Sequence, residues 1–202
     1  MAFLNRSMAE VHCKIVYYGP GFGGKTTNLE WIFSRLSNRG AVDMTRISTG
    51  RDRTLYFDLL PLDLGSIFGY RTRLHLYTVP GQPRYNASRR IILQGVDGIV
   101  FVADSHPEQL FWNRVSFENL RQNLLLTSRT LESIPLVMQY NKRDRHDAVA
   151  VDQLNRLLNG RAWPVYPSIA TEGQGVLETL KAIVGIVVGE LARGKCEVAT
   201  RV

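Results

Sequence analysis

The sequence predicts an α/β fold, a three-layer sandwich in which helices cover a six-stranded, mostly parallel sheet with one antiparallel edge strand. Three observations predict it. A glycine-rich segment, GPGFGGKT at residues 19–26, lies between an apolar run and a stretch whose apolar residues have helical spacing. Further apolar runs of strand length alternate with helical segments along the chain. The length of 202 residues suits one such domain with a full core and is short for two.

Six segments are predicted as strands. Residues 11–18 form the apolar run before the glycine-rich segment, and residues 54–60 and 71–77 follow. Gly65 and Gly69 lie between these two later segments and favour a hairpin, so the pair is expected to be antiparallel. Residues 98–103 are apolar throughout, as in a central parallel strand. Residues 136–140 are the fifth strand, and residues 165–169, which include a proline, are a predicted edge strand.

The segments between the strands are predicted to be helical. The first helix covers residues 27–36, and the last covers about 176–191 and is ended by Gly194. Residues 151–158 form another, stopped by the Asn159–Gly160 pair. Ser105 and Glu108 fit a capping box that opens a long helix. Its expected core-facing residues are Leu110, Val115, Phe117, Leu120 and Leu124. We expect one domain over residues 1–202, with its core at about 11–191 and short flexible termini.

The glycine-rich segment fits the pattern G-x-x-x-x-G-K-[ST] and has the strand and the helix that this pattern needs on either side. Glycines let backbone N–H groups turn toward one anion, and the N-terminus of the helix adds a partial positive charge. Lys25 can reach the β- and γ-phosphates of a nucleotide, and the Thr26 hydroxyl can ligate Mg²⁺. The alternative, a chance glycine-rich turn, does not account for the flanking strand and helix.

The net charge is +7, from 25 Lys and Arg against 18 Asp and Glu. Such a balance fits a protein that binds nucleic acid or an anionic membrane, but here the cations are scattered, which favours a solvated surface. No specific nucleic acid is therefore expected. The longest apolar run, residues 183–188, is too short to cross a bilayer, so membrane contact is expected to be peripheral at most. The two cysteines, Cys13 and Cys196, have no metal-binding spacing and fit a reduced, cytosolic setting.

A second motif, NKRD at residues 141–144, directly follows a predicted buried strand. The Asp144 carboxylate can accept hydrogen bonds from N1–H and the exocyclic amine of guanine, and adenine offers no matching pair of donors. Asn141 can tie this loop to the glycine-rich segment, and the aliphatic stem of Lys142 can cover the face of the base. Because ligands of open α/β sheets bind at the carboxyl ends of the strands, both motifs are expected to contact one nucleotide.

Four stretches of the chain carry a resemblance to a known family: residues 14–21, 53–58, 76–82 and 95–105. On these stretches the chain resembles the Ras-superfamily small GTPases, and closer still the gliding-protein MglA group of bacteria and archaea. The run TVPGQ at residues 78–82 is especially informative, because most Ras relatives have Asp where Thr78 stands. The resemblance covers about residues 11–191 and implies a small G domain of the P-loop NTPase type.

The resemblance implies GTP or GDP and Mg²⁺ as cofactors, and it assigns roles to individual residues. Thr54 would close on Mg²⁺ and the γ-phosphate, and the Gly81 amide would meet the γ-phosphate. The Ala170 N–H would contact guanine O6. Catalytic roles go to Gln82, which would orient the attacking water, to Arg53, which resembles an arginine finger, and to Lys25. Thr26 and Thr54 are the expected metal ligands. The expected nucleotide-binding residues are Gly19, Gly21, Gly23, Gly24, Lys25, Thr26, Thr27, Thr54, Gly81, Asn141, Lys142, Asp144 and Ala170.

The same resemblance implies a GTP/GDP switch that hydrolyses GTP slowly without a partner. Its activating partner would be a roadblock-type, MglB-like homodimer, and its downstream effectors would act in cell polarity or motility. A cytoplasmic protein recruited to a cell pole is expected.

The chain departs from the group at Pro83–Arg84, where apolar residues are usual, at Gly50 and at Arg145. Because Pro83 disfavours the helical region for Gln82, an alternative remains open, a nucleotide-binding scaffold with negligible hydrolysis.

Several polar and aromatic residues have no role assigned by a motif. Since Thr78 leaves no aspartate in the usual place, Asp58 either supports Mg²⁺ through water or is structural, and its mid-strand position favours the second reading. His12, His75, His106 and His146 are not expected to cluster and are assigned no chemistry. Trp31, Trp112 and Trp163 are expected to be packing residues.

Overall fold

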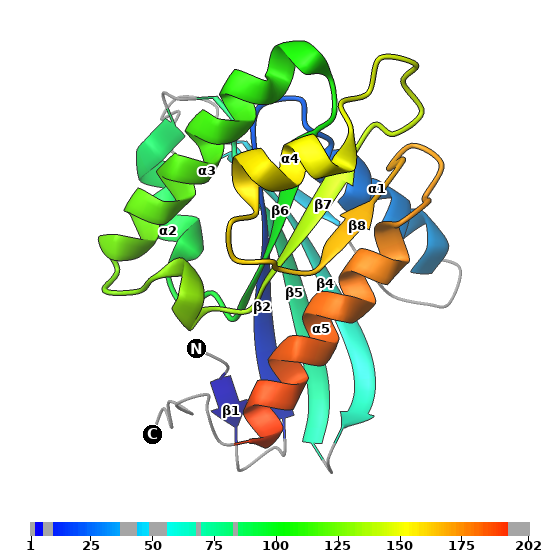
Figure 1. The fold of residues 1–202 in the computed structure, drawn as a ribbon. Helices are drawn as coiled ribbons and strands as arrows, with labels where there is room; N and C mark the ends of the chain where they lie inside the picture. The colour runs from blue at the N-terminus through cyan, green and yellow to red at the C-terminus, as the bar shows by residue number, and fades with distance from the viewer. Residues whose placement is uncertain are drawn as a thin grey trace.

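The computed structural model describes residues 3–5, 10–36, 44–48, 56–67, 70–82 and 85–193. Helices cover both faces of a central twisted sheet (Figure 1). The strands are β1 (Phe3–Asn5), β2 (Glu10–Tyr18), β3 (Thr45–Ser48), β4 (Tyr56–Ile67), β5 (Tyr70–Thr78), β6 (Gly98–Asp104), β7 (Leu136–Asn141) and β8 (Val165–Pro167). The α-helices are α1 (Lys25–Leu36), α2 (Asn86–Leu93), α3 (Leu110–Leu125), α4 (Val151–Leu158) and α5 (Val176–Ala192). Two single-turn 3₁₀ helices are η3 (Pro107–Gln109) and η4 (Leu131–Ser133).

The strands follow the order β3-β4-β5-β2-β6-β7-β8, and β1 pairs with β2. Strand β2 is parallel to β5 and β6, and β7 is parallel to β6 and β8. Strand β4 is antiparallel to β5, as predicted, although Gly65 lies inside β4 and Gly69 lies outside the described residues. The mostly parallel α/β sandwich is therefore confirmed, and all six predicted strands lie in the sheet. Strands β1 and β3 were not predicted. Because β3 pairs with β4, the antiparallel edge contains two strands.

Alternate residues of the central strands supply two separate cores. On β6, Ile99 and Phe101 lie in the core beneath α2, α3 and α4, whereas Val100 and Val102 lie in the core beneath α1 and α5. All seven residues of β6 are buried, since the strand has a helical layer on each face. Cys13 is a buried residue of β2, in the core beneath α1 and α5.

The parallel strands bring the ends of five segments to the same edge of the sheet. Strands β2, β5, β6, β7 and β8 end at Tyr18, Thr78, Asp104, Asn141 and Pro167. The glycine-rich segment, the TVPGQ run, the NKRD motif and the Ile169–Ala170 pair each begin at or directly follow one of these ends. The topology thus gathers the predicted site segments at the edge where open α/β sheets bind their ligands.

Two predictions about α3 are wrong. Ser105 does not cap a helix; His106 is instead the N-cap of η3, where its side chain accepts a hydrogen bond from the Glu108 N–H. Pro107 explains the shift, because the residue before a proline is pushed to extended backbone, and His106 has ψ 135°. Val115 does not face the core and is 38% exposed. Leu120 and Leu124 are buried as predicted, and Asn113 and Asn123 complete the buried side of α3.

The remaining helix predictions agree closely with the structure. Helix α4 has the predicted bounds, and α5 ends one residue beyond the prediction, while Gly194 lies outside the described residues. Within the described ranges, no helix has both the length and the apolarity that a membrane crossing requires.

Candidate functional site

The glycine-rich loop between β2 and α1 has a backbone that only glycine fits at two positions. Gly19 and Gly24 have φ values of 146° and 98°. A Cβ atom on Gly19 would lie 2.1 Å from the Val102 carbonyl oxygen, and one on Gly24 would lie 2.1 Å from Asn141 Nδ2. The loop is therefore packed directly on the ends of β6 and β7. Phe22 also has positive φ, 60°, and its side chain is 88% exposed.

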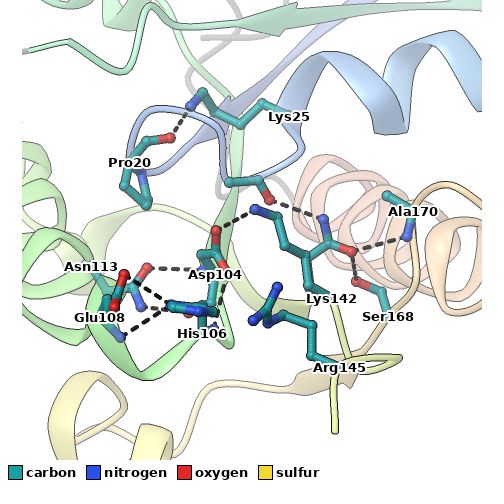
Figure 2. A network of polar contacts seen from close by, with 12 residues as sticks. Pro20, Lys25, Asp104, His106, Glu108, Asn113, Lys142, Arg145, Ser168 and Ala170 are labelled. Atoms are coloured by element: carbon teal, nitrogen blue, oxygen red, sulfur yellow. Dashed lines mark hydrogen bonds and ion pairs between the residues drawn. The ribbon is translucent and has the colours of Figure 1, made fainter. Parts of the chain in front are cut away.

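Lys25 is the first residue of α1 and is almost completely buried. Its Nζ atom donates to the carbonyl oxygens of Gly19 and Pro20 at 2.9 and 2.6 Å, and Figure 2 shows the second bond. Burial, with a smaller contribution from the charge of Arg89, lowers the pKa of Lys25 from 10.5 to about 7, while Asp58 opposes the shift. The Lys25 ammonium thus lies inside the loop that the motif assigns to phosphate binding. A bound anion would stabilise its charged form, because it would offset the cost of burial.

Thr26 lies beside Asp58, for which a structural role was favoured from the sequence. The Thr26 hydroxyl donates to Asp58 Oδ2 at 2.6 Å, and the Thr78 hydroxyl donates to the same oxygen at 2.9 Å. Mg²⁺ takes hydroxyl and carboxylate oxygens as ligands, directly or through water, so this oxygen-rich group fits the ion. Most Ras relatives have an aspartate at the position of Thr78. In this chain, the Asp58 carboxylate lies next to that position. Thr54, the other expected metal ligand, lies outside the described residues, as does Arg53.

The loop after β5 brings Gly81 directly onto the glycine-rich loop. A Cβ atom on Gly81 would lie 2.3 Å from the Gly21 nitrogen. The buried Arg89 of α2 holds this loop, because its Nη1 atom donates to the carbonyl oxygens of Pro80 and Gln82 at 3.0 and 2.7 Å. Pro83 and Arg84 lie outside the described residues.

Gln82 is exposed, and its side chain lines a groove of about 470 Å³ beside the glycine-rich loop. Trp112 and Val115 of α3 also line this groove. Trp112 was expected to be a packing residue, but it is 46% exposed and faces this groove. Phe22 lines the same groove, so an apolar surface adjoins the residue that the resemblance makes catalytic.

Asn141 joins the NKRD loop to the glycine-rich loop. Its Nδ2 atom donates to the Gly23 carbonyl oxygen at 2.9 Å. Its Oδ1 atom accepts from the Ser168 hydroxyl at 3.1 Å and from the Ala170 N–H at 2.9 Å (Figure 2). The Ala170 amide, which the resemblance assigns to guanine O6, therefore has Asn141 as its partner in this structure. One side chain connects the three segments expected to contact phosphates and base.

The other residues of the NKRD loop have different surroundings. Asp144 is exposed, as a group that binds a base from solvent must be. Lys142 has φ 65°, and its Nζ atom lies 2.5 Å from Asp104 Oδ2, an ion pair that was not predicted. Asp104 is the last residue of a buried parallel strand. A polar residue at the carboxyl end of such a strand often lies near a ligand site, and this position could have indicated its role.

Comparisons with known proteins agree with this geometry. Residues 2–187 match the family model of the ADP-ribosylation factor family. The chain belongs to the ADP-ribosylation factor family. It is 52% identical over 194 residues to the mutual gliding-motility protein MglA of Myxococcus xanthus, covering 96% of this chain and all of MglA. It is 25% identical over 160 residues to ADP-ribosylation factor-like protein 2 of Arabidopsis thaliana, covering 76% of this chain and 84% of that protein.

As a member of the ADP-ribosylation factor family and a near relative of MglA, the chain is a GTP-binding small GTPase of the Ras superfamily. The resemblance stated from the sequence motifs is confirmed. One expectation about the histidines is wrong, because His12 and His75 pair across β2 and β5. His12 Nδ1 lies 2.9 Å from His75 Nε2, and the rings are stacked. Neighbouring parallel strands bring the two residues together, although 63 positions separate them in the chain.

Proposed function

We propose that this GTPase binds GTP with Mg²⁺ in the site built on residues 19–26 and 141–144, hydrolyses it slowly to GDP and phosphate, and changes conformation between the two states. The observation that carries the proposal is the Asn141 side chain, which links the Gly23 carbonyl of the phosphate loop to the Ala170 amide. Phosphate recognition and base recognition are thereby held at a fixed separation, as one nucleotide requires.

The chain's own groups divide the work of binding. Lys25 would exchange the carbonyl oxygens of Gly19 and Pro20 for phosphate oxygens, which are better partners for an ammonium. The Thr26 hydroxyl, supported by Asp58, would bind Mg²⁺, whose charge offsets that of the phosphates. Because the γ-phosphate would contact Thr54 and Gly81 only in the triphosphate state, those contacts would favour the active conformation.

The nucleotide can be tested before any turnover is measured. The nucleotide that co-purifies with the protein should be GDP or GTP when it is released by denaturation and separated by chromatography. Asp144→Asn should weaken the preference for guanine and favour xanthine, because the amide presents a donor where the carboxylate presented an acceptor. Unchanged GTP affinity in that variant would contradict the role given to Asp144.

Hydrolysis is proposed to depend on Gln82, aided by Arg53 as an arginine finger from the same chain. The competing function is a nucleotide-binding scaffold with negligible hydrolysis, favoured by Pro83, which constrains the backbone of Gln82. Single-turnover hydrolysis of bound GTP separates them, with the wild type compared with Gln82→Ala. Equal rates in the two proteins would remove the catalytic role of Gln82, and a negligible wild-type rate would favour the scaffold.

The cellular role is proposed from the 52% identity to a protein named for gliding motility. We expect a cytoplasmic switch recruited to a cell pole, with a roadblock-type, MglB-like homodimer as activator and polarity or motility effectors downstream. Adding the purified homodimer to the single-turnover assay should raise the hydrolysis rate. An unchanged rate with a homodimer that binds the GTP form would exclude it as the activator.

A further inference from the structure

We propose that Asp104 is a positioning residue of the NKRD loop and determines how long a bound guanine nucleotide stays on the protein. The inference rests on the proposed nucleotide site and concerns a residue that no motif assigns to it. Asp104 ends β6, and its side chain is only 2% exposed. Figure 2 shows the side chains of Asp104 and Lys142 pointing toward one another from separate segments of the chain.

Asp104 is held in place from several sides. Its Oδ2 atom accepts from Lys142 Nζ at 2.5 Å, and its Oδ1 atom accepts from the His106 N–H at 3.0 Å. The side-chain amide of Asn113, from α3, fixes its backbone by accepting from the Asp104 N–H at 2.9 Å and donating to its carbonyl oxygen at 2.8 Å. A buried carboxylate with partners on both oxygens is a rigid acceptor, since any displacement leaves a charge unpaired in the protein interior.

Lys142 is the residue that this rigid acceptor restrains. It lies between Asn141, which bonds the phosphate loop, and Asp144, which is assigned to the base. Its φ of 65° is unfavourable for a residue with a side chain, so the conformation needs support from its surroundings. A free lysine side chain also has many rotamers, and the ion pair to Asp104 selects those that keep the ammonium beside β6. Lys142 is therefore held in the conformation that leaves its stem available to the base.

The residues after Asp104 extend the contact along the same loop. The Ser105 N–H donates to the Asn141 carbonyl oxygen at 3.0 Å, and the Val149 N–H donates to the Ser105 carbonyl oxygen at 2.8 Å. His106 Nε2 lies 3.5 Å from a carboxylate oxygen of Asp147. Among these contacts, the Asp104–Lys142 pair is the one that joins a buried charge to a side chain of the NKRD motif. Residues 104–106 thus support residues 141–149 from the side of β6.

This geometry predicts a specific kinetic effect. The described contacts of the Asp104 side chain are with Lys142 and His106, neither in the phosphate loop nor in the Gly81–Gln82 loop. Its loss should therefore weaken the hold on the base without changing the hydrolytic step. GDP and GTP share that base, so their release should accelerate by the same factor. From the usual strength of a charge-assisted hydrogen bond, we expect release to be about 10- to 100-fold faster.

The experiment measures release of fluorescently labelled GDP and of a non-hydrolysable labelled GTP analogue from Asp104→Asn, with excess unlabelled nucleotide present. The matched control is Asp63→Asn, which removes one charge from the exposed ion pair between Asp63 of β4 and Arg71 of β5. We expect both labelled nucleotides to leave Asp104→Asn faster by the same factor, the control to match the wild type, and single-turnover hydrolysis of pre-bound GTP to stay within about twofold. Wild-type release rates, or an effect on one nucleotide alone, would overturn the proposal.

A second variant keeps the test decisive if Asp104→Asn folds poorly. Lys142→Met removes the same ion pair from its more exposed side, and the double variant Asp104→Asn/Lys142→Met should release nucleotide no faster than the faster single variant. Independent, multiplying effects would show that the two residues act separately and would overturn the inference. A wild-type protein that binds neither GDP nor GTP would instead refute the proposed function itself.

Discussion

The hydroxyl of Thr26 and the carboxylate of Asp58 meet at 2.6 Å, joining the start of α1 to β4. Thr78, which stands where most Ras relatives have an aspartate, donates to the same carboxylate oxygen at 2.9 Å. Asp58, from the neighbouring antiparallel strand, thus places a carboxylate beside Thr78 at the end of β5. The two strands place it within reach of the hydroxyl expected to bind Mg²⁺.

Asp58→Asn should therefore weaken the part of nucleotide binding that depends on Mg²⁺. In the wild type, chelating Mg²⁺ should accelerate GDP release strongly, and in Asp58→Asn release should already be about tenfold faster and respond less to the chelator. Asp63→Asn, which changes an exposed carboxylate of the same strand, serves as control. An Asp58→Asn protein with the full response to the chelator would assign the residue a structural role only.

The lowered pKa of Lys25 predicts that nucleotide binding takes up a proton above pH 7. The folded protein without ligand releases the Lys25 proton near pH 7, and phosphates should restore its affinity for the proton. At pH 8.5 we expect uptake of about one proton per nucleotide, measured by calorimetry in buffers of different ionisation enthalpy. Lys25→Met should lose this uptake, whereas Lys14→Met, which removes a lysine that bonds the Gln94 carbonyl, should retain it.

The same shift makes stability depend on pH. The unfolded chain keeps the Lys25 proton up to about pH 10.5, and the folded, nucleotide-free chain keeps it only up to about pH 7. Between these values the unfolded state binds more protons, so the contribution of Lys25 to the free energy of unfolding rises with pH. Below pH 7 that contribution is unfavourable and constant. If Lys25→Met left the slope of stability against pH unchanged between pH 7 and 10, this assignment would be wrong.

Gly24→Ala should abolish tight nucleotide binding. Its new Cβ atom would lie 2.1 Å from Asn141 Nδ2, and the φ of 98° is unfavourable for alanine. The Asn141–Gly23 bond would have to break or the loop would have to move, at a cost of about 1–3 kcal/mol for the backbone conformation alone. Gly160→Ala is the control, since a Cβ there meets nothing within 4 Å. The two proteins should differ in melting temperature and in GDP affinity, and equal values would contradict the prediction.

Arg89→Met should slow GTP hydrolysis while leaving nucleotide affinity nearly unchanged. The buried guanidinium bonds the carbonyls on both sides of Gly81, so its loss frees the loop that carries Gln82. A small displacement of a catalytic group can cost about 100-fold in rate, and we expect a loss of 10- to 100-fold in single-turnover hydrolysis. Arg90→Met, an exposed neighbour on α2, should match the wild type. A wild-type rate in Arg89→Met would show that this loop keeps its position without the guanidinium.

Local patterns predicted most of the fold. Runs of apolar residues and nearby turn residues predicted the end of β2 and the bounds of α4, and they placed the ends of β6 and β7 one residue early. Val115 was misplaced because α3 buries Asn113, so its buried stripe includes a polar residue and lies two positions away from Val115. The short strands β1 and β3 depend on pairing with distant segments, which periodicity in a few residues does not reveal.

The parts of the candidate site that could be predicted are those where a sequence motif requires a particular backbone conformation. Residues 19–26 and Asn141 are such positions, and their expected link is present in the structure. Arg89 and Asp104 were not predictable, because they act through contacts across different elements, and Asp58 was raised from the sequence only as an alternative to a structural role. The His12–His75 pair was missed for the same reason. Motif spacing in the sequence therefore predicts the residues that contact a ligand more readily than the residues that position those contact residues.

The three side-chain hydrogen bonds of Asn141 have a consequence for the length of ligand that the protein is expected to accept. Because one short amide side chain joins Gly23 to Ala170, the span between the two recognition loops is set during folding and not during binding. A ligand whose length matches this span loses its translational freedom only once, and it gains binding free energy from contacts with both loops. Guanosine and pyrophosphate supplied as separate fragments would each lose that freedom, and together they should bind far more weakly than GDP. We therefore expect the protein to select its ligand by molecular length as well as by chemical group.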